Sequence, residues 1–380
     1  WVKDTGTTPS TNIPSTGSFW GVCRSLWNWV TLAGYNLVGL GTNLKFYIQP
    51  SSGGAFYDVT PLRRIGGTTT PTVANCFTAA YSTLSSGINA TDTSLTVASG
   101  TNFPNAGVVQ IDTEIIAYTG KSTNTLTGLV RGYNGTTAAT HSSSAGVGSY
   151  VLRVTHAGNG SQANDFVTFA SAASLGGNMT ATVLNQEFQV LAVESSSVYT
   201  ILAQAYSTLN GSFGATATTI TLTSTTDFPS TGGVLKVDSE QIYFAGKSGS
   251  TLTGLVRGFN GTTAAAHNSG AVVYAPVQAT SADTGNGGAS TTAQYQITTG
   301  YDTYTTATGW GAGGWGGVTT GFTSTGWGRS AATGVGIDLR LWSQDNFGQD
   351  LIINPRSGAL YYWAVNSSPT TYDRGQLMYA

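Results

Sequence analysis

The chain has few charged side chains. Its 380 residues contain 15 Lys+Arg and 17 Asp+Glu, so charged residues make up 8% of the sequence, against about a quarter in an ordinary soluble protein. The formal net charge is −2, and the charges are scattered along the chain. Proteins that bind DNA or RNA through its phosphates need a concentrated basic surface. We therefore do not expect nucleic acid as a partner.

Cysteine and histidine are also scarce. The two cysteines, Cys23 and Cys76, are too few for a disulfide-stapled scaffold and leave a structural zinc site short of ligands. Their spacing leaves open whether they pair or stay as thiols. The three histidines, His141, His156 and His267, occur without a Gly-x-Ser-x-Gly nucleophile sequence. We expect no metal, no cofactor and no serine-hydrolase triad.

Long apolar runs are missing too. The most apolar stretch, residues 26–40, is interrupted by Asn and Gly and is shorter than the ~20 residues that a membrane-spanning helix needs. We therefore expect no membrane-spanning segment. Because the chain begins at Trp1 and its only methionines are Met179 and Met378, we expect a processed or truncated piece.

Glycine, hydroxyl side chains and aromatics are abundant. The sequence contains 51 Gly, 40% hydrophobic residues and 11% aromatic residues. Disordered chains combine low hydrophobicity with high net charge, whereas the polarity here comes from neutral side chains. The composition therefore indicates folded, loop-rich β structure, and the length allows about two to four domains.

One segment of the chain occurs twice. Residues 125–132 recur without change as residues 251–258. The match extends on both sides and defines two β-rich modules, residues 80–149 and residues 205–275. Because the flanks of each module read as continuous strands when the module is removed, we predict that both are inserted into loops of a host domain.

Each module is predicted to consist of strands and tight turns. Alternating Thr, Val, Leu and Ile predict strands at residues 88–97 and 215–222. Residues 108–118 predict a hairpin with acidic residues at its tip. The Asn-Gly pairs at 134 and 260 predict two-residue turns, because both residues tolerate positive φ.

The remaining segments complete a predicted all-β fold. Residues 1–79 and 276–380 contain short strands with aromatic ends and glycine turns, typical of a β-propeller blade or a meander. The second of these segments also has a Gly/Trp-rich loop at residues 309–327. Two blade-like units cannot close a propeller by themselves. For the middle segment, residues 150–204, we expect a barrel-like arrangement.

Several strings of residues resemble structural tail proteins of tailed bacteriophages. They are residues 165–169, 184–188, 309–327 and 339–356, with blade-strand strings at 41–45 and 57–61. The repeated module, which ends Arg-Gly-x-Asn-Gly-Thr-Thr-Ala-Ala-x-His, is similar to a β-rich insertion of phage tail and fibre proteins. The resemblance implies a virion component without catalysis, often propeller-like, at the hub, nozzle or baseplate of the tail.

Paired acids occur at equivalent positions of both modules. A glycoside hydrolase needs two carboxyl groups across the scissile bond, but these pairs lie at predicted turn tips and recur identically, whereas active sites need convergent groups in a cleft. We interpret the acids as turn caps or partners of a module arginine, and the module histidine as a loop hydrogen-bonding residue. The residues concerned are Asp112, Glu114, Arg131 and His141 in the first copy and Asp238, Glu240, Arg257 and His267 in the second.

Three tryptophans separated by glycines are the candidate contact residues. Trp310, Trp315 and Trp327 offer flat faces that suit the sugar rings of a bacterial surface. The alternative is that they pack against a neighbouring strand or subunit, as aromatic anchors of interfaces do. We favour packing.

These observations predict a structural component of a bacteriophage tail, located in the virion, that acts through assembly with copies of itself and other tail proteins. Neutral Ser, Thr and Asn surfaces can be buried between subunits without desolvating ions. The alternative is a receptor-binding adhesin that recognises a host surface glycan. A tail-associated depolymerase is a third hypothesis, but the acids lack a convincing site, and we expect no enzymatic activity.

Overall fold

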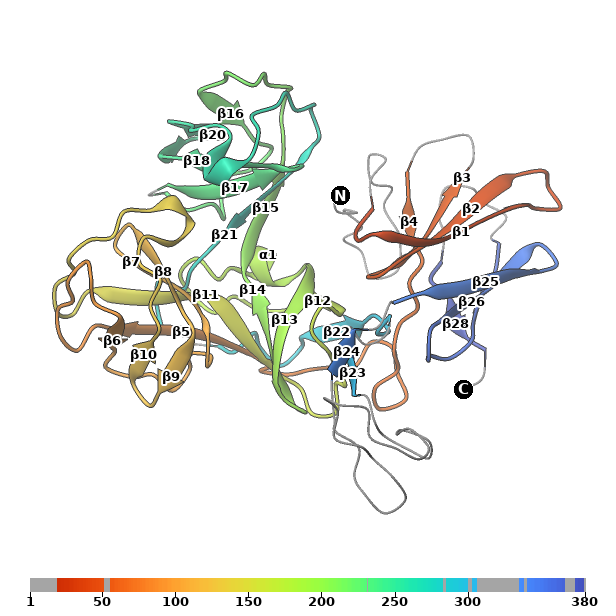
Figure 1. Cartoon of the computed structure of the whole chain (residues 1–380), viewed down its shortest axis with the longest axis horizontal. Helices are drawn as coiled ribbons and strands as arrows, with labels where there is room; N and C mark the ends of the chain where they lie inside the picture. Colours follow the sequence, from red (N-terminus) through yellow and green to blue (C-terminus); the bar gives the residue numbers. More distant parts are fainter. Residues whose placement is uncertain are drawn as a thin grey trace, which may run out of the picture.

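The computed structural model describes residues 19–50, 55–230, 232–282, 285–299, 303–305, 335–337, 340–365 and 373–378. It is an all-β structure (Figure 1). Strands account for 47% of the residues and helices for 3%, which confirms the predicted fold class. The described strands form seven antiparallel sheets. Antiparallel strands need only short connections, which suits the glycine-rich turns of this chain.

Two four-stranded sheets come from the two ends of the chain. The first consists of β1 (Cys23–Val30), β2 (Asn36–Thr42), β3 (Phe46–Pro50) and β4 (Tyr57–Asp58). The second consists of β25 (Trp342–Phe347), β26 (Asp350–Pro355), β27 (Tyr361–Trp363) and β28 (Gln376–Leu377). Neighbours in each sheet are consecutive in sequence, so both blade-like segments are meanders.

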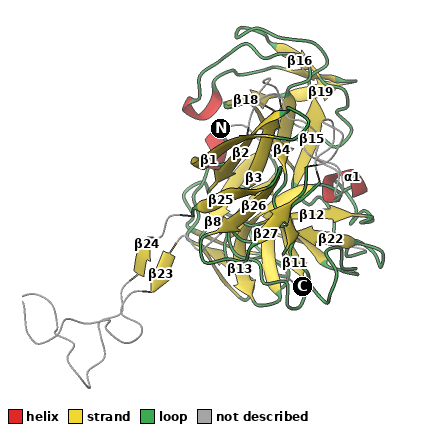
Figure 2. Ribbon diagram, turned by 90° about the vertical axis from the view of Figure 1, so that its right-hand side faces the viewer, coloured by secondary structure: helices red, strands yellow, loops and turns green. Residues whose placement is uncertain are grey.

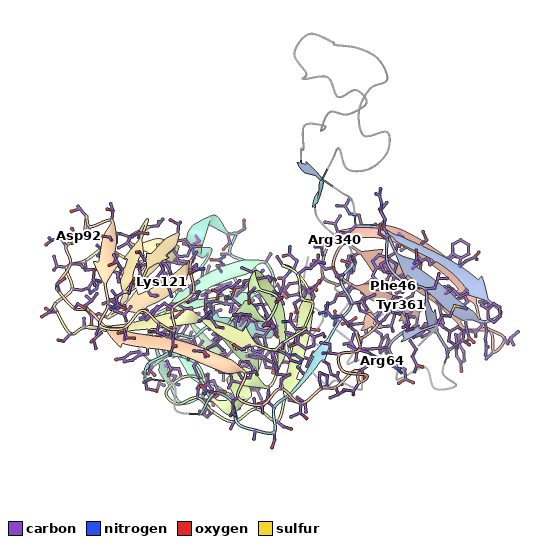
Figure 3. The ribbon with its side chains drawn as sticks, turned by 90° about the horizontal axis from the view of Figure 1, so that it is seen from below. Phe46, Arg64, Asp92, Lys121, Arg340 and Tyr361 are labelled. Carbon is purple, nitrogen blue, oxygen red and sulfur yellow. The ribbon has the colours of Figure 1, made fainter. Side chains whose placement is uncertain are left out.

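The two terminal sheets share one apolar core. The rings of Phe46 and Trp342 have centroids 5.0 Å apart, and those of Trp29 and Trp363 are 6.1 Å apart. Figure 3 shows Phe46 and Tyr361 between the two sheets, at the opposite end of the molecule from the first module. Because each buried aromatic side chain removes about 150–250 Å² from water, these rings hold the first and last strands together.

An eight-stranded sheet forms the middle of the molecule. Its strands are β5 (Phe77–Thr83), β7 (Gly107–Ile111), β8 (Glu114–Tyr118), β11 (Gly146–Thr155), β12 (Phe166–Ala170), β13 (Glu187–Ser195), β14 (Val198–Leu202) and β22 (Thr292–Tyr295). Their order is β22-β12-β13-β14-β11-β7-β8, with β5 also paired to β11. Within the described residues the two outermost strands do not pair with each other, so the sheet is open and the middle segment is not a closed barrel.

The two modules contain equivalent strands. Besides β5, β7, β8 and β11, these are β6 (Ser94–Thr96), β9 (Gly120–Ser122), β10 (Thr125–Thr127), β15 (Gln204–Thr208), β16 (Thr219–Thr221), β17 (Gly233–Val237), β18 (Glu240–Phe244), β19 (Gly246–Ser248), β20 (Thr251–Thr253) and β21 (Val272–Pro276). Each module has a three-stranded sheet, β6-β10-β9 or β16-β20-β19. Each also has a hairpin, β7-β8 or β17-β18, whose first strand pairs with the strand that leaves the module.

The strands predicted at residues 88–97 and 215–222 are shorter than expected. Only their last parts form β6 and β16. In the first module the Asp92 carboxylate accepts a hydrogen bond from the Asn89 main-chain N–H at 2.8 Å. Such side-chain turns compete with strand pairing, and this one interrupts the predicted strand.

The predicted hairpin and Asn-Gly turns are confirmed. The hairpin at residues 108–118 is β7 and β8, joined by the turn residues Asp112 and Thr113, and Glu114 is the first residue of β8. Asn134 and Gly135 have φ of 56° and 76°, within the short 3-10 turn η1 (Tyr133–Gly135). Asn260 has φ of 52° in the equivalent turn η2 (Phe259–Gly261). The left-handed backbone explains why Asn and Gly occupy these positions.

Each module is attached through two paired strands. In the first module (residues 80–149, yellow and orange in Figure 1), β5 and β11 run in and out, and Ala79 pairs with Leu152. In the second module (residues 205–275), β15 and β21 do the same, and Gln204 pairs with Pro276. The predicted module limits therefore fall inside continuous strands, and each module projects from a two-stranded ribbon.

The cores of the two modules are connected differently. The first module has its own cluster of buried residues, which includes Ile111, Ile116 and Leu126. The second module contributes Leu235 and Ile242 to the same cluster as the middle sheet. The first module is thus a separate packing unit, whereas the second is continuous with the body.

The structure also contains one short α-helix and one isolated pair of strands among its described residues. The helix α1 (Ala181–Leu184) begins after Thr180, whose side chain accepts from the Val183 N–H, and Figure 2 shows it beside the strands of the body. The strands β23 (Thr303–Thr305) and β24 (Val335–Ile337) pair with each other. Among the described residues, no helix is long and apolar enough to cross a membrane.

The cysteines are not paired. Cys23 is exposed on β1 and Cys76 is buried next to β5, and both are free thiols. Burial raises the pKa of the Cys76 thiol to about 12. Because the thiolate is the reactive form, Cys76 behaves as a small apolar core residue.

Candidate functional site

Glu114, Arg131 and His141 meet inside the first module. Glu114 begins β8 and is 1% exposed. Arg131 Nε and Nη2 each donate to a different carboxylate oxygen of Glu114 at 2.8 Å. His141 Nε2 lies 2.7 Å from Glu114 Oε2, and its Nδ1 lies 2.7 Å from Asp112 Oδ2. The expected arginine–acid pair is formed, and the histidine bridges the two acids.

Main-chain groups complete this cluster. The N–H groups of Gly132 and Ala139 donate to the Glu114 carboxylate at 2.9 and 3.1 Å. Arg131 also donates to the carbonyls of Ala139 and Asn89. Bidentate Arg–carboxylate pairs are strong because both groups are charged and planar. The buried Glu114 carboxylate thus joins the β7-β8 hairpin to the loops that contain Gly132 and Ala139. Both of its oxygens accept hydrogen bonds from groups of the same module.

The second module repeats this geometry. Arg257 Nε and Nη2 donate to Glu240 at 2.8 and 2.7 Å. His267 lies 2.8 Å from Glu240 and 2.7 Å from Asp238. One contact differs, because the Arg257 guanidinium lies 4.7 Å from the centroid of the Phe213 ring, which adds a cation–π interaction.

The environment of the two glutamates favours their ionised form. Burial alone raises the pKa of the Glu114 carboxyl, but hydrogen bonds from Arg131, His141 and the main chain outweigh it and lower the pKa to about 2. The pKa of Glu240 is lowered to about 2 for the same reasons. A general acid needs a raised pKa, so the shift is opposite to the one that acid catalysis requires.

The other predicted residues lie apart from these clusters. His156 Nδ1 is 2.9 Å from the Tyr295 hydroxyl, and burial followed by the Arg63 charge lowers the pKa of His156. Trp310, Trp315 and Trp327 lie outside the described residues. In the described part of the chain, no group of His, Cys, Asp or Glu side chains is arranged to hold a metal ion.

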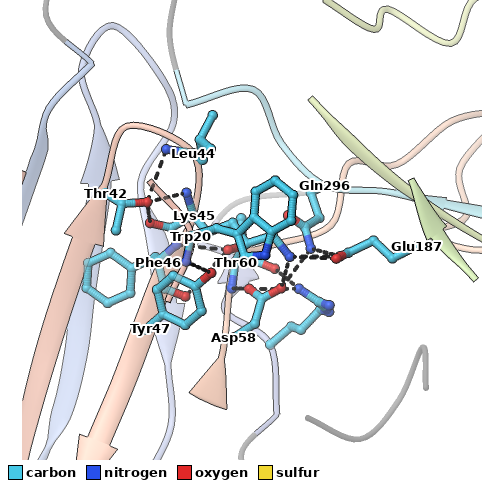
Figure 4. A network of polar contacts seen from close by, with 11 residues as sticks. Trp20, Thr42, Leu44, Lys45, Phe46, Tyr47, Asp58, Thr60, Glu187 and Gln296 are labelled. Atoms are coloured by element: carbon cyan, nitrogen blue, oxygen red, sulfur yellow. Dashed lines mark hydrogen bonds and ion pairs between the residues drawn. The ribbon is translucent and has the colours of Figure 1, made fainter. Parts of the chain in front are cut away.

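A buried ionic network joins the terminal sheets to the middle sheet (Figure 4). Lys45 is fully buried, and its Nζ donates to Asp58 at 2.8 Å and to both oxygens of Glu187 at 2.8 and 2.9 Å. Gln296 Nε2 donates to the same two acids at 2.8 and 2.9 Å. Arg374 Nη1 lies 3.2 Å from Asp58. Segments from four regions of the chain therefore meet at one point.

Sequence reasoning missed this network. Burial alone raises the pKa of Asp58, but Arg374 and Lys45 hold the pKa well below its usual range. Buried charges are retained where they are paired. The available signal was a lysine directly before the apolar strand β3 and an acid between Tyr57 and Val59, because charges inside apolar strings are expected to have partners.

A cavity of about 370 Å³ lies between the second module, the middle sheet and the start of the first terminal segment. Its walls combine aromatic rings, amide side chains and one exposed acid. The lining residues that bear on its chemistry are Trp20, Asn134, Gln189, Gln204, Lys236, Asp238, Gln241 and Tyr274. Asp238 is the single predicted site residue in this wall. Small-molecule sites commonly have volumes of about 300–1,000 Å³.

Comparison with protein-family models, with curated proteins and with solved structures finds no match to this chain. The likeness of its residue strings to phage tail proteins therefore remains a prediction.

Proposed function

We propose that this chain is a structural subunit of a bacteriophage tail that acts by assembling with copies of itself and with other tail proteins. Two features of the sequence support the proposal. One is the resemblance of residues 165–169 and 339–356 to such proteins. The other is the low content of charge, 8% of residues, which permits large neutral surfaces to be buried at low desolvation cost.

The observation that carries the proposal is a set of exposed apolar side chains on and near β1 and at the end of β25, called here the β1 edge. It consists of Leu26, Val30, Leu32 and Phe347, which are 63%, 59%, 89% and 64% exposed. Monomeric soluble proteins rarely leave contiguous apolar surface in water. Burial of this edge between subunits would remove it from water.

The position of β1 in its sheet adds a second reason. Among the described strands, β1 pairs only with β2, so its other edge has main-chain groups available for pairing. Proteins usually cover such edges or protect them with charges. Trp27 Nε1 donates to Asn346 Oδ1 at 2.7 Å, which places β25 beside the same edge. Both terminal sheets would therefore contribute to one subunit contact.

Light scattering coupled to size exclusion tests the assembly. We expect the wild-type chain to form a discrete oligomer, and we expect Leu26→Lys combined with Val30→Lys to reduce it to the monomer. Val193→Lys is the matched control, because Val193 is 42% exposed on β13, and it should leave the oligomer intact. A wild-type chain that stays monomeric over a wide concentration range would contradict the proposal.

Immunogold electron microscopy tests the location. Antibodies raised against the purified chain should label the tails of intact particles at one site. Labelling of the head alone, or of no particle, contradicts a tail location, and it does so independently of the oligomer measurement.

A further inference from the structure

The cavity beside the second module has hydrogen-bonding atoms without partners among the described residues. Gln241 Oε1 accepts from Asn260 at 2.8 Å, which leaves its Nε2 donor unused. Asn134 Oδ1 likewise accepts from Asn260 at 3.1 Å, which leaves its amide donor unused. Asp238 uses Oδ2 toward His267, and its Oδ1 remains an acceptor. Donors and acceptors therefore face the same space.

Two aromatic side chains of the wall are held in place by neighbouring rings. Trp20 packs edge-on to Phe166 with ring centroids 5.4 Å apart. Tyr274, on β21, lies 5.6 Å from the ring of Tyr206 on β15. Rings fixed by such packing lose little conformational entropy on binding, and their faces suit the apolar C–H surface of a sugar ring.

The first module provides an internal comparison for this wall. The acid, arginine and histidine of the cluster are identical in the two modules, but Lys236, Gln241 and Tyr274 replace Gln110, Ile115 and Gly148. The module framework is therefore the same, and these three side chains of the cavity wall are specific to the second copy.

The equivalent surface of the first module is closed. Gln110 is satisfied internally, since its amide donates to the Asp112 carbonyl at 2.7 Å and accepts from the Tyr150 hydroxyl at 2.6 Å. A Cβ on Gly148 would lie 1.9 Å from the Ala279 carbonyl oxygen, so main chain covers this position. The two acids also differ in surroundings, because Asp112 is 62% exposed to solvent, whereas Asp238 is 41% exposed in the cavity wall.

We propose that this cavity binds a neutral saccharide of one or two rings. Hydroxyl groups both donate and accept hydrogen bonds, which matches the amides and the exposed Asp238 carboxylate of the wall. The wall contains one lysine, Lys236, and two acids, Glu187 and Asp238, so it offers no cationic cluster for a phosphate or sulfate group. The site is independent of subunit assembly, because it shares no residue with the β1 edge.

Saturation-transfer difference NMR on the full chain tests the proposal. The probes are glucose, galactose, mannose and N-acetylglucosamine, with inorganic phosphate and N-acetylneuraminic acid as charged probes. We expect at least one neutral sugar to bind saturably. We expect Tyr274→Ala and Gln241→Ala each to weaken that binding by about tenfold or more.

Two further variants separate a site effect from loss of folding. Tyr133→Ala removes an aromatic side chain that is 41% exposed on the first module and outside the cavity, and it should leave binding unchanged. The combined replacement Lys236→Gln, Gln241→Ile and Tyr274→Gly gives the second module the first module's side chains and should abolish binding. Binding of none of the neutral sugars, binding of the charged probes alone, or unchanged sugar binding by Gln241→Ala would overturn the proposal, whatever the oligomeric state.

Discussion

Lys45 is the central cation of the buried network between the terminal sheets and the middle sheet. Its ammonium is the cation shared by Asp58 and Glu187, all three being almost fully buried. It also lies 4.5 Å from the centroid of the Phe166 ring. Removing one member of a buried ion pair leaves an uncompensated charge, which is more costly than replacing the pair as a whole.

We predict that Lys45→Met lowers the free energy of unfolding by about 3–5 kcal/mol. Two carboxylates would then share a buried site without the ammonium that contacts both of them. Urea unfolding followed by tryptophan fluorescence measures the change. Lys236→Met, at an exposed lysine, is the control for stability and should change it by less than about 0.5 kcal/mol. Equal effects of the two substitutions would refute the role of the network.

The buried glutamates predict a loss of stability in acid. The native pKa of Glu114 and of Glu240 is about 2, below the unfolded value of about 4.3. Each therefore contributes stability that is complete above about pH 5 and is lost as the pH falls toward 2, with a full value of about 3 kcal/mol per module.

Urea unfolding between pH 7 and pH 3 measures this dependence. We expect the combined variant Glu114→Gln and Glu240→Gln to be less stable at pH 7 and to show a flatter pH profile than the wild type. The pKa of Asp58 is also lowered, so part of the dependence of the free energy of unfolding on pH should remain in this variant. If the free energy of unfolding had the same slope against pH in the variant as in the wild type, the Glu114 and Glu240 clusters would not be the cause of the acid sensitivity.

At the scale of the element, the loop between β20 and η2 depends on a left-handed glycine. Gly258 has φ of +61°, and a Cβ there would lie 2.8 Å from the Thr262 carbonyl oxygen. Gly258→Ala should lower the melting temperature, because the substitution combines strained backbone with a contact to main chain, at a cost of about 1–3 kcal/mol. Gly214, in the same module, is the control: a Cβ added there would have no heavy atom within 4 Å, and its φ is not positive. The melting temperature of the Gly214→Ala variant should therefore match or exceed that of the wild type. Equal losses at both sites would contradict this account.

Element prediction from the sequence succeeded where local chemistry decides. The β7-β8 hairpin and the Asn-Gly turns are specified by turn residues and alternation, and they are observed. β1 was not predicted, because its strand Cys23–Val30 has apolar residues on both faces and lacks the alternation of a half-buried strand. The strand predicted at residues 88–97 is observed only in its last part, because the Asp92 turn competes with strand pairing.

The candidate site was predictable only in part. The repeat singled out the glutamate, arginine and histidine of each module, since they recur at equal spacing, and an arginine partner was one of two roles predicted for the acids. The contact of the histidine with both acids was not predicted. The Lys45 network and the cavity join residues from distant parts of the sequence, such as Gln296 and Asp58, which are 238 positions apart. Contacts of that range depend on tertiary packing and leave no local pattern in the sequence.

At the scale of the whole molecule, the two modules should respond differently to deletion. Because Ala79 and Leu152 are paired neighbours, replacing residues 80–151 by Asn-Gly closes the ribbon with a favourable two-residue turn. The first module has a separate core, so we expect the remainder to unfold cooperatively with near-native circular dichroism. The matched deletion of residues 205–275 removes part of the shared core and should abolish cooperative unfolding. Loss of folding in the first deletion, or its retention in the second, would contradict this division.

The packing of the first strands against the last has a consequence for biosynthesis. The Trp342 indole donates to the Thr42 carbonyl, a contact between residues 300 positions apart. At about 5–20 residues per second, the ribosome needs about 15–60 s to make the intervening chain. During that interval the C-terminal sheet that covers Phe46 and Trp29 has not been synthesised. The apolar face of the nascent N-terminal meander therefore stays exposed to water. Chaperone occupancy on translating ribosomes should therefore begin when this meander emerges and end when β26 does.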